Sequence, residues 1–521
     1  MYRVVAFLLV GVLAVCAQVN VTVNWTSVKY AINPQSFGLN GFQATDPANA
    51  TNATYSGNMA YMLGSRSGGG MVRIHTWEML GTGVHGWLNS DSTWNATKIK
   101  QAVKGLRDAG MTLCINIPDG SQASNRIGNP TGFGSFCADL VRIINVDGGY
   151  GVKYWEIPNE ANTSLSGVQQ AAVFNAAAAA MKAVDETIKV GGPATSRPDQ
   201  QSEVQAFVDA TLSNLDFLSF HTYAGGGGMT DEAVWNAAGC EWYCLYMSSY
   251  LAQKSPNRHI PVWYDEFNVG WSWDLAQAQQ QGICGAIYDA LTLTKASDAG
   301  ADVMTAWNEM DGSYGKMDNN YALRPAAHVY HIFNSFVYGD RVTTTTAKDS
   351  VIVPYASVNP GDGRHSCVLT NRTKTQRTVT IASSGWTPPA TMSAYQLTPS
   401  GYAQIANIAS SQLTSGIMLP AQSVTVLTCL SATSVSLRTG LRLEQLAGLR
   451  IRDGVVVAPQ AMRGVSLYSV DGKVIMEHSF TMEARSFTLP HLSPGLYLVV
   501  GHLSSGVDVT AKHCPEARVV Q

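Results

Sequence analysis

Two short stretches of the sequence each end in a glutamate that follows a run of apolar residues. The first reads KYWEIPNEAN, residues 153–162, and carries Glu160. The second reads PVWYDEFNVG, residues 261–270, and carries Glu266 at a similar position much later in the chain. Buried strands of one sheet can deliver such acids to the same opening. The pair therefore points to chemistry that needs two carboxyl groups.

Two carboxyl groups across a cleft are what cleavage of a glycosidic bond requires. One must be protonated to donate to the leaving oxygen, and the other must be ionised to attack the anomeric carbon or to activate water. Repulsion between the two groups helps to raise the pKa of the acid. A separation of about 5–5.5 Å predicts retention of configuration, and a larger one predicts inversion.

The segments that must position these acids alternate between short apolar runs and helix-like stretches over residues 36–340. Eight strand–helix repeats predict an α/β fold, a (β/α)8 TIM barrel. An open doubly wound sheet is the alternative, but no glycine-rich dinucleotide motif follows the first strand. The predicted strands are 37–42, 71–77, 112–118, 152–160, 188–192, 215–223, 262–268 and 302–307, and the clearest predicted helices are 97–109, 168–184, 204–212, 275–296 and 326–336.

In this barrel Glu160 ends the fourth strand and Glu266 ends the seventh, so both are expected at the C-terminal face, where barrel enzymes carry out their chemistry. His75 and Asn116 also lie at predicted strand exits and are candidates for substrate binding. Trp271 follows Glu266 in the loop that would form a wall of the cleft. Aromatic faces suit the C–H-rich faces of sugars, although such tryptophans could equally be ordinary core residues.

The pattern changes after the barrel. Residues 341–432 alternate apolar and polar residues between turn signals, which predicts an all-β sandwich. Residues 18–35 show the same alternation and are expected to contribute N-terminal strands to it. Residues 433–445 read as a linker, and 446–521 read as a small C-terminal β-domain with strand-like runs around turn signals.

The N-terminus predicts export. Residues 1–17 form a short apolar run followed by small residues, which is typical of a secretory signal peptide cleaved after Ala17. A lipoprotein signal would use Cys16, but Val15 is a poor residue before a lipidated cysteine. No other stretch is long and apolar enough for a membrane helix. We therefore expect a secreted or cell-surface attached protein.

The composition and charge of the chain limit the classes of molecule that it is expected to bind. Hydrophobic residues make up 45% of the chain and charged residues only 14%, with a formal net charge of −3 and no basic stripe. Nucleic acid and anionic membranes are therefore poor partners, whereas a neutral carbohydrate fits. No metal or organic cofactor is expected, since no histidine or cysteine cluster matches a zinc site. Cys240 and Cys244 are close enough in the sequence to form a disulfide.

The two glutamate motifs resemble those of a known clan. WEIPNEAN and VWYDEFNVG are similar to the acid/base and nucleophile motifs of clan A glycoside hydrolases, and the chain most resembles families 39 and 51. AINPQSFGLNGF, LDFLSFHTYAGG and LPAQSVTVLTC follow in the same order as in those families, so the resemblance covers roughly residues 19 to 430. It implies a retaining mechanism with Glu160 as acid/base and Glu266 as nucleophile.

The same resemblance implies roles for neighbouring residues. Asn159 would bind the sugar 2-hydroxyl, Tyr223 would hydrogen-bond the nucleophile, and Arg73 would keep it ionised. His221 would line the site, and Trp307 would form a stacking floor for a sugar ring. Structural alternatives are an ion pair for Arg73 and a core position for His221.

One residue departs from the pattern of these families. Pro158 stands where they usually carry Gly or Trp before the Asn-Glu pair. This leaves the substrate open among xylosides, arabinofuranosides and endo-cleaved glucans or mannans.

The C-terminal domain resembles the sorting domain of the bacterial type IX secretion route. The similarity rests on Asp471-Gly472-Lys473 after a strand-like run and on LSPGLY at 492–497, and it implies the secretion machinery as a partner. The end of the chain is longer and more polar than that pattern, and an additional small β-domain is the alternative.

Together these features predict a secreted retaining glycoside hydrolase that acts on plant or algal polysaccharides or oligosaccharides. A catalytically silent carbohydrate-binding barrel and a surface scaffold are the competing classes. The presence of both acids argues against a silent barrel.

Overall fold

The computed structural model describes residues 18–64, 70–75, 77–118, 128–273, 277–430, 450–452, 455–469, 474–488, 497–503 and 508–513. The predicted signal peptide, the linker and the sorting motifs at 471–473 and 492–496 lie wholly or largely outside these ranges. The chain divides into two compact units, Met1–Val435 and Ser436–Gln521. Among the helices described, none is long and apolar enough to cross a bilayer.

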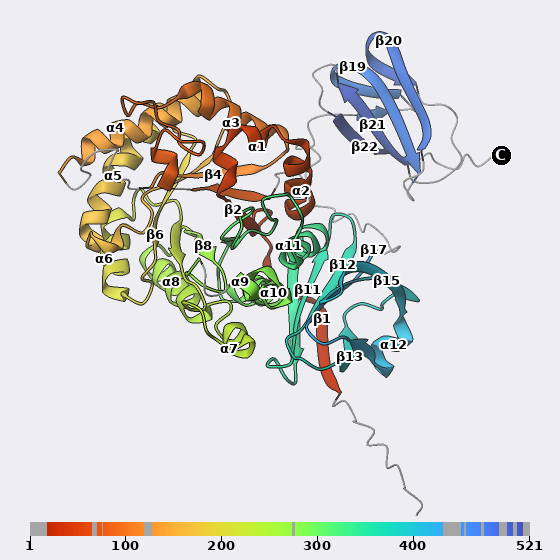
Figure 1. The fold of residues 1–521 in the computed structure, drawn as a ribbon. Coiled ribbons are helices and arrows are strands. Elements are labelled where there is room, and N and C mark those ends of the chain that lie inside the picture. The colour runs from red at the N-terminus through yellow and green to blue at the C-terminus, as the bar shows by residue number, and fades with distance from the viewer. Residues whose placement is uncertain are drawn as a thin grey trace, which may run out of the picture. The chain divides into compact units, whose positions relative to one another are not determined.

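The first unit contains a closed barrel of eight parallel strands in chain order (Figure 1). All eight predicted strands are confirmed, although most are shorter than expected. They are β2 (Phe37–Gly41), β3 (Met71–Ile74), β4 (Thr112–Asn116), β5 (Tyr154–Glu156), β6 (Lys189–Thr195), β7 (Leu218–His221), β8 (Val262–Phe267) and β9 (Val303–Ala306).

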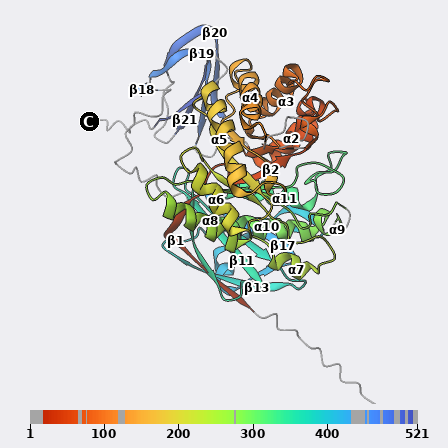
Figure 2. The ribbon, with the colours of Figure 1, turned by 90° about the vertical axis from the view of Figure 1, so that its left-hand side faces the viewer.

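Helices cover the outside of the barrel (Figures 1 and 2). In α3, Ile99, Ala102, Val103 and Leu106 are buried at helical spacing, which is the pattern of a helix with one face on a core. The main helices are α2 (Ala53–Leu63), α3 (Ala96–Asp108), α4 (Pro130–Val141), α5 (Gly167–Val184), α6 (Gln201–Thr211), α7 (Asp231–Asn236), α8 (Glu241–Lys254), α10 (Ile283–Asp298) and α11 (Pro325–Phe336).

Two expectations about this layer are corrected. The helix expected over 275–296 is divided into α9 (Gln277–Gln281) and α10, because Gly282 between them has an extended backbone. Cys240 and Cys244 are both free thiols and form no disulfide. Cys244 lies in α8 and is buried, whereas Cys240 precedes the helix and contacts the Tyr264 hydroxyl at 3.5 Å.

The predicted sandwich is a mixed sheet of nine strands that wraps around its own core. The N-terminal strand β1 (Val19–Ala31) pairs antiparallel with β10 and parallel with β13, as its alternating pattern predicts. The sheet order is β15-β14-β17-β12-β11-β10-β1-β13-β16, with β10 (Asp340–Thr346), β11 (Ile352–Asn359), β12 (Arg364–Asn371), β13 (Arg377–Ser384), β14 (Thr391–Thr398), β15 (Gly401–Ala409), β16 (Ile417–Leu419) and β17 (Ser423–Leu430).

An ion pair between buried Arg341 and partly exposed Asp298 joins this sheet to the barrel. Arg341 in β10 donates from Nε and Nη2 to the two carboxylate oxygens of Asp298, at 3.0 and 2.9 Å, at the end of α10. The guanidinium also lies 4.1 Å from the ring centre of Tyr355. These contacts anchor the nine-stranded sheet to the C-terminal end of α10.

The second unit is a five-stranded antiparallel sheet, in agreement with the predicted small β-domain. Its order is β18-β19-β21-β22, and β20 pairs with β19. The strands are β18 (Arg450–Arg452), β19 (Val455–Ser469), β20 (Val474–Thr488), β21 (Tyr497–Leu503) and β22 (Asp508–His513).

Candidate active site

Glu160 lies beyond the end of its strand, which corrects the expectation that it ends the strand. β5 stops at Glu156, and the chain then passes through a cis peptide bond between Ile157 and Pro158. Glu160 has φ 49° and ψ 28°, in the left-handed region, and its N–H donates to the Ala194 carbonyl at 3.0 Å. Side chains held in this backbone region concentrate at functional sites.

Glu266 lies within β8, one residue before its end, and is 8% exposed. One carboxylate oxygen of Glu266, one of Glu160 and one ring nitrogen of His221 all lie within 4.8 Å of one another. The Glu160 side chain is 30% exposed. The two acids therefore face each other at the C-terminal end of the barrel, as the sequence predicts.

The carboxylate of Glu266 is surrounded by potential donors. The Tyr223 hydroxyl donates to Oε1 at 2.5 Å, which is the contact that the resemblance implies. On the other oxygen, Arg73 Nη1 lies at 3.5 Å and His221 Nδ1 at 3.6 Å. These contacts fix the side chain, and each of them lowers the pKa of Glu266 against the larger, opposite effect of burial.

Arg73 is fully buried and contacts more residues than expected. Its closest acidic partner is Glu156, since Nε donates to Oε2 at 2.7 Å. Nη1 donates to Asn40 Oδ1 and Nη2 donates to Asn159 Oδ1, both at 2.7 Å. Arg73 thus holds Asn159, the residue before the acid, as well as contacting Glu266.

His75 and Asn116 lie beneath the two acids. His75 Nδ1 donates to Asn116 Oδ1 at 2.8 Å, and the Asn116 Nδ2 amide donates to Glu156 Oε2 at 2.7 Å and to the Pro158 carbonyl at 3.2 Å. Both residues are buried. Asn116 therefore supports the strand end that carries Glu160, and its amide is already occupied.

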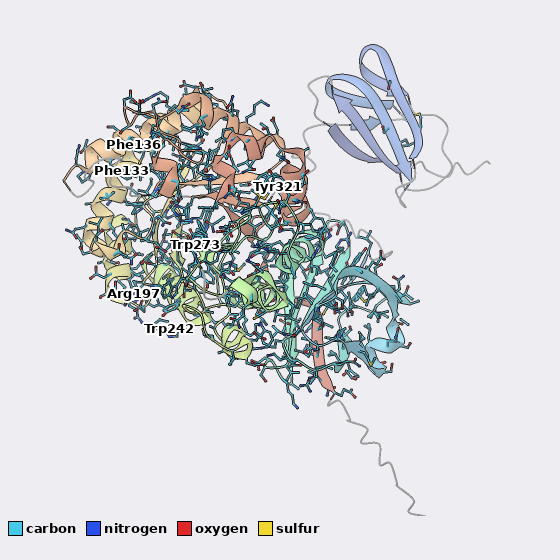
Figure 3. All side chains as sticks on the ribbon, viewed as in Figure 1. Phe133, Phe136, Arg197, Trp242, Trp273 and Tyr321 are labelled. Atoms are coloured by element: carbon cyan, nitrogen blue, oxygen red, sulfur yellow. The ribbon has the colours of Figure 1, made fainter. Side chains whose placement is uncertain are left out.

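Aromatic residues that follow the barrel strands pack against one another. Trp307 directly follows β9 and packs edge-on against Phe42, with ring centres 5.5 Å apart. Phe42 also lies 6.0 Å from Trp273, which contacts Tyr314 at 4.7 Å. Figure 3 places Trp273 near the middle of the barrel, in contrast to Trp242 at its periphery.

Trp271 is 66% exposed, yet its position is fixed from one side. Its backbone N–H donates to the Gly225 carbonyl at 3.0 Å. A Cβ on Gly226 would lie 2.7 Å from Trp271 Cζ2, so the glycine backbone lies directly against the indole. The glycine run 225–228 therefore supports a tryptophan that is otherwise open to solvent.

The charges of the site act on one another. Burial alone would lower the pKa of His221, but Glu266, Asp265 and Glu160 raise it to about 10. The hydrogen bond between His221 Nδ1 and Glu160 Oε1, at 2.8 Å, and the histidine charge hold the pKa of Glu160 below its usual value despite burial. Burial raises the pKa of Glu266. These directions favour a proton on His221 over one on Glu160.

Two buried acids beneath the site were not among the predicted site residues. Burial raises the pKa of Glu156 to about 8 despite the charge of Arg73. Asp265 is buried as well, but contacts with Glu156, Arg73 and His221 keep its pKa below the usual value. Both lie inside the two glutamate motifs, four residues and one residue before the predicted catalytic acids. Strand alternation would place Asp265 and Glu266 on opposite faces, so the sequence did not indicate that both point into the barrel.

The aromatic residues Phe42 and Tyr314 were also missed, because the sequence does not show which strand-end loops meet. Glu160, His221 and Glu266 could in principle surround a cation. His221 already hydrogen-bonds Glu160, and Tyr223 and Arg73 contact Glu266.

A family model for glycosyl hydrolases family 39 matches residues 150–313. This segment contains both acids as well as His221, Tyr223 and Trp307. A comparison with curated protein sequences found no match.

Several solved structures share the fold. A GH51 arabinofuranosidase from Xanthomonas axonopodis pv. citri has a TM-score of 0.61 at 14% identity, and a monomeric β-xylosidase from Caulobacter crescentus CB15 has 0.58 at 15%; each match covers 80% of this chain and 100% of the other. A bifunctional glucanase-xylanase from a metagenome library has 0.59 at 15%, covering 80% and 99%. The family match and this shared barrel support a glycoside hydrolase.

Proposed function

We propose that this protein is a retaining glycoside hydrolase in which Glu266 is the nucleophile and Glu160 is the acid/base. The observation that carries the proposal is the approach of the two carboxyl groups to within 4.8 Å, measured between one oxygen of each. Retaining enzymes need a short separation, about 5–5.5 Å between the carboxyl groups, because no water has to fit between nucleophile and sugar.

The surroundings of the two acids support this division of roles. Tyr223 and Arg73 stabilise negative charge on Glu266, as a nucleophile that later leaves as a carboxylate requires. Glu160 is the more exposed acid and contacts His221. In the first step the proton passes from His221 Nδ1 through Glu160 to the leaving oxygen. In the second step Glu160 accepts a proton from the attacking water and returns it to His221.

A neutral carbohydrate chain is the substrate class that we propose. Trp271 and Trp273 follow Glu266 in the chain and are 66% and 47% exposed, so their rings are available to sugar faces. Glycans of plant or algal origin fit the low charge of the chain, and the structural neighbours described above include enzymes named for xylan, xyloside and glucan chemistry.

A panel of aryl glycosides tests the proposal. Release of the chromophore from a β-xyloside, an α-arabinofuranoside or a β-glucoside would identify the accepted sugar, and Glu266→Ala should reduce turnover by about a thousandfold or more. A fluorinated sugar that forms a stable ester should label Glu266, as mass spectrometry of the peptide would show. Labelling of another residue, or inversion of configuration in the product, would refute the mechanism.

The competing class is a carbohydrate-binding barrel without catalysis. It would bind oligosaccharides in calorimetry and release no chromophore, and Glu160→Gln and Glu266→Gln would leave its function unchanged. The paired acids and the donors around Glu266 favour the enzyme, because a binding barrel has no need of a nucleophile held in this way.

We also propose export of the protein through the N-terminal signal peptide and sorting by the C-terminal domain, which would place it outside the cell or at its surface. The sequence features of residues 1–17 and 446–521 support this proposal. N-terminal sequencing of protein recovered from the culture medium should begin at Gln18. Retention in the cytoplasm with an intact Met1 would contradict it.

A further inference from the structure

Two fully buried carboxyl groups lie beneath the site and have no part in the reaction steps above. Glu156 is the last residue of β5, and Asp265 precedes Glu266 in β8. Both carboxyl groups lie against the Arg73 guanidinium, Glu156 Oε2 at 2.7 Å and Asp265 Oδ2 at 3.6 Å, on strands that are not neighbours in the sheet. Two buried acids in contact are costly and need a physical reason.

A hydrogen bond between two carboxyl groups needs a proton, because ionised carboxylates only accept. Oε2 of Glu156 already accepts from Arg73 Nε and Asn116 Nδ2, both at 2.7 Å. Its Oε1 and both oxygens of Asp265 are buried without a well-formed hydrogen bond from an N–H group in the described part of the chain. One proton shared by the pair satisfies two of these oxygens.

The proton resides on Glu156 and the charge on Asp265. Burial raises the pKa of Glu156 to about 8, while the contacts of Asp265 keep its pKa low. Counting charges gives the same answer, since two buried cations, Arg73 and His221, then face three carboxylates and not four. An additional buried negative charge would be strongly disfavoured.

The pair contacts a neighbour of each catalytic acid, His221 beside Glu160 and Arg73 beside Glu266. Asp265 Oδ1 lies 3.4 Å from His221 Nε2, and the other ring nitrogen of His221 is 2.8 Å from Glu160. On the other side Glu156 holds Arg73, whose Nη1 is 3.5 Å from Glu266. The ionisable groups that face the pair or His221 are Arg73, His75, Cys114, Glu160 and Glu266.

We propose that Glu156 and Asp265 share one proton and act as positioning residues for the two catalytic acids. Ionised Asp265 holds His221 in the protonated form that supplies Glu160, and neutral Glu156 leaves the charge of Arg73 available to Glu266. The inference rests on the proposed function, because it assigns a task only if Glu160 and Glu266 cleave a glycosidic bond.

The first test is Asp265→Asn, which keeps the shape and removes the charge. His221 loses a neighbouring negative charge, so its pKa falls. We expect kcat/KM near neutral pH to drop by about tenfold or more with KM within about threefold, and the alkaline limb of the pH profile to move down by about one pH unit or more. An unchanged alkaline limb in an active, folded variant overturns the proposal.

The second test is Glu156→Gln, an uncharged replacement of the same shape as protonated glutamate. Its amide can donate to Asp265 while its oxygen still accepts from Arg73. We expect a loss of kcat/KM at least about tenfold smaller than that of Asp265→Asn. If Glu156 were ionised in the native site, this variant would leave the Arg73 charge without its closest ionised partner. Glu156→Gln would then lose more activity than Asp265→Asn, and that result would refute the shared proton.

Asp289→Asn is the matched control. Asp289, in α10, is fully buried and paired with Lys316 at 2.6 Å. Its loss should lower stability without moving either limb of the pH profile. Histidine NMR of the full chain gives a second readout, since the His221 titration should fall in Asp265→Asn whether or not turnover is detected. An inactive wild type with that shift would refute the proposed function alone, whereas an active wild type without it would refute this inference.

Discussion

The hydrogen bond from Tyr223 to Glu266 permits a quantitative prediction. Tyr223→Phe removes one hydroxyl, which donates to Oε1 at 2.5 Å, and leaves the ring in place. A hydrogen bond to a charged group contributes about 1.5–3 kcal/mol, so we take about 2 kcal/mol. This corresponds to about thirtyfold in rate and about 1.5 units in pKa.

The direction of each effect follows from the role of the hydroxyl. It stabilises the carboxylate of Glu266, so its loss raises the pKa of that group above its present, already raised value. The acid limb of kcat/KM should therefore move to higher pH. Departure of Glu266 as a carboxylate in the second step should slow by about thirtyfold, because the developing charge has lost a donor. The Tyr223 hydroxyl stays protonated throughout, since burial and Glu266 raise its pKa well above the usual value.

The assay uses an activated aryl glycoside and stopped-flow detection of the chromophore. We expect a burst of product in the variant followed by slow turnover, because hydrolysis of the glycosyl-enzyme becomes rate-limiting. Tyr246→Phe is the matched control, since the Tyr246 hydroxyl donates to the Gln201 carbonyl at 3.2 Å, between α8 and α6 on the outside of the barrel. A Tyr223→Phe enzyme with the wild-type acid limb and no burst would refute the assignment of Glu266 as the nucleophile.

Three further predictions concern the contact of Gly226 with Trp271, the junction between the barrel and the nine-stranded sheet, and the buried acid pair. Gly226→Ala places a Cβ 2.7 Å from Trp271, so the indole must shift; turnover of a polysaccharide should fall severalfold more than turnover of an aryl glycoside, and equal losses would contradict a substrate contact. Asp298→Ala leaves the Arg341 charge buried and unpaired, so the free energy of unfolding in urea should fall by about 3 kcal/mol, with a change below about 0.5 kcal/mol contradicting the junction. Glu156→Gln should flatten the pH dependence of stability. The pKa of Glu156 is raised to about 8, so the wild type loses free energy of unfolding progressively between the unfolded pKa, 4.5, and pH 8. The same slope of unfolding free energy against pH in both proteins would contradict the raised pKa.

Much of the site could be predicted because two properties are local in the sequence. The apolar runs before Glu160 and Glu266 indicate buried strands, and parallel strands of a barrel all present their C-terminal ends on one face. The alternation of apolar and polar residues over 18–35 likewise predicts that β1 joins the nine-stranded sheet, because one face of each strand must face a core.

What the sequence did not reveal depends on distances across the barrel. By itself the sequence determined the strand–helix repeat, the two acids and the motifs around them, since these follow from periodicity and from the order of residues. Only the tertiary structure decided that Glu160 lies four residues beyond its strand, that Arg73 contacts Glu156 more closely than Glu266, and that Asp265 lies behind His221. The reason is physical: the pKa of a buried group and its partners depend on side chains from strands remote in the chain, which meet only when the barrel closes.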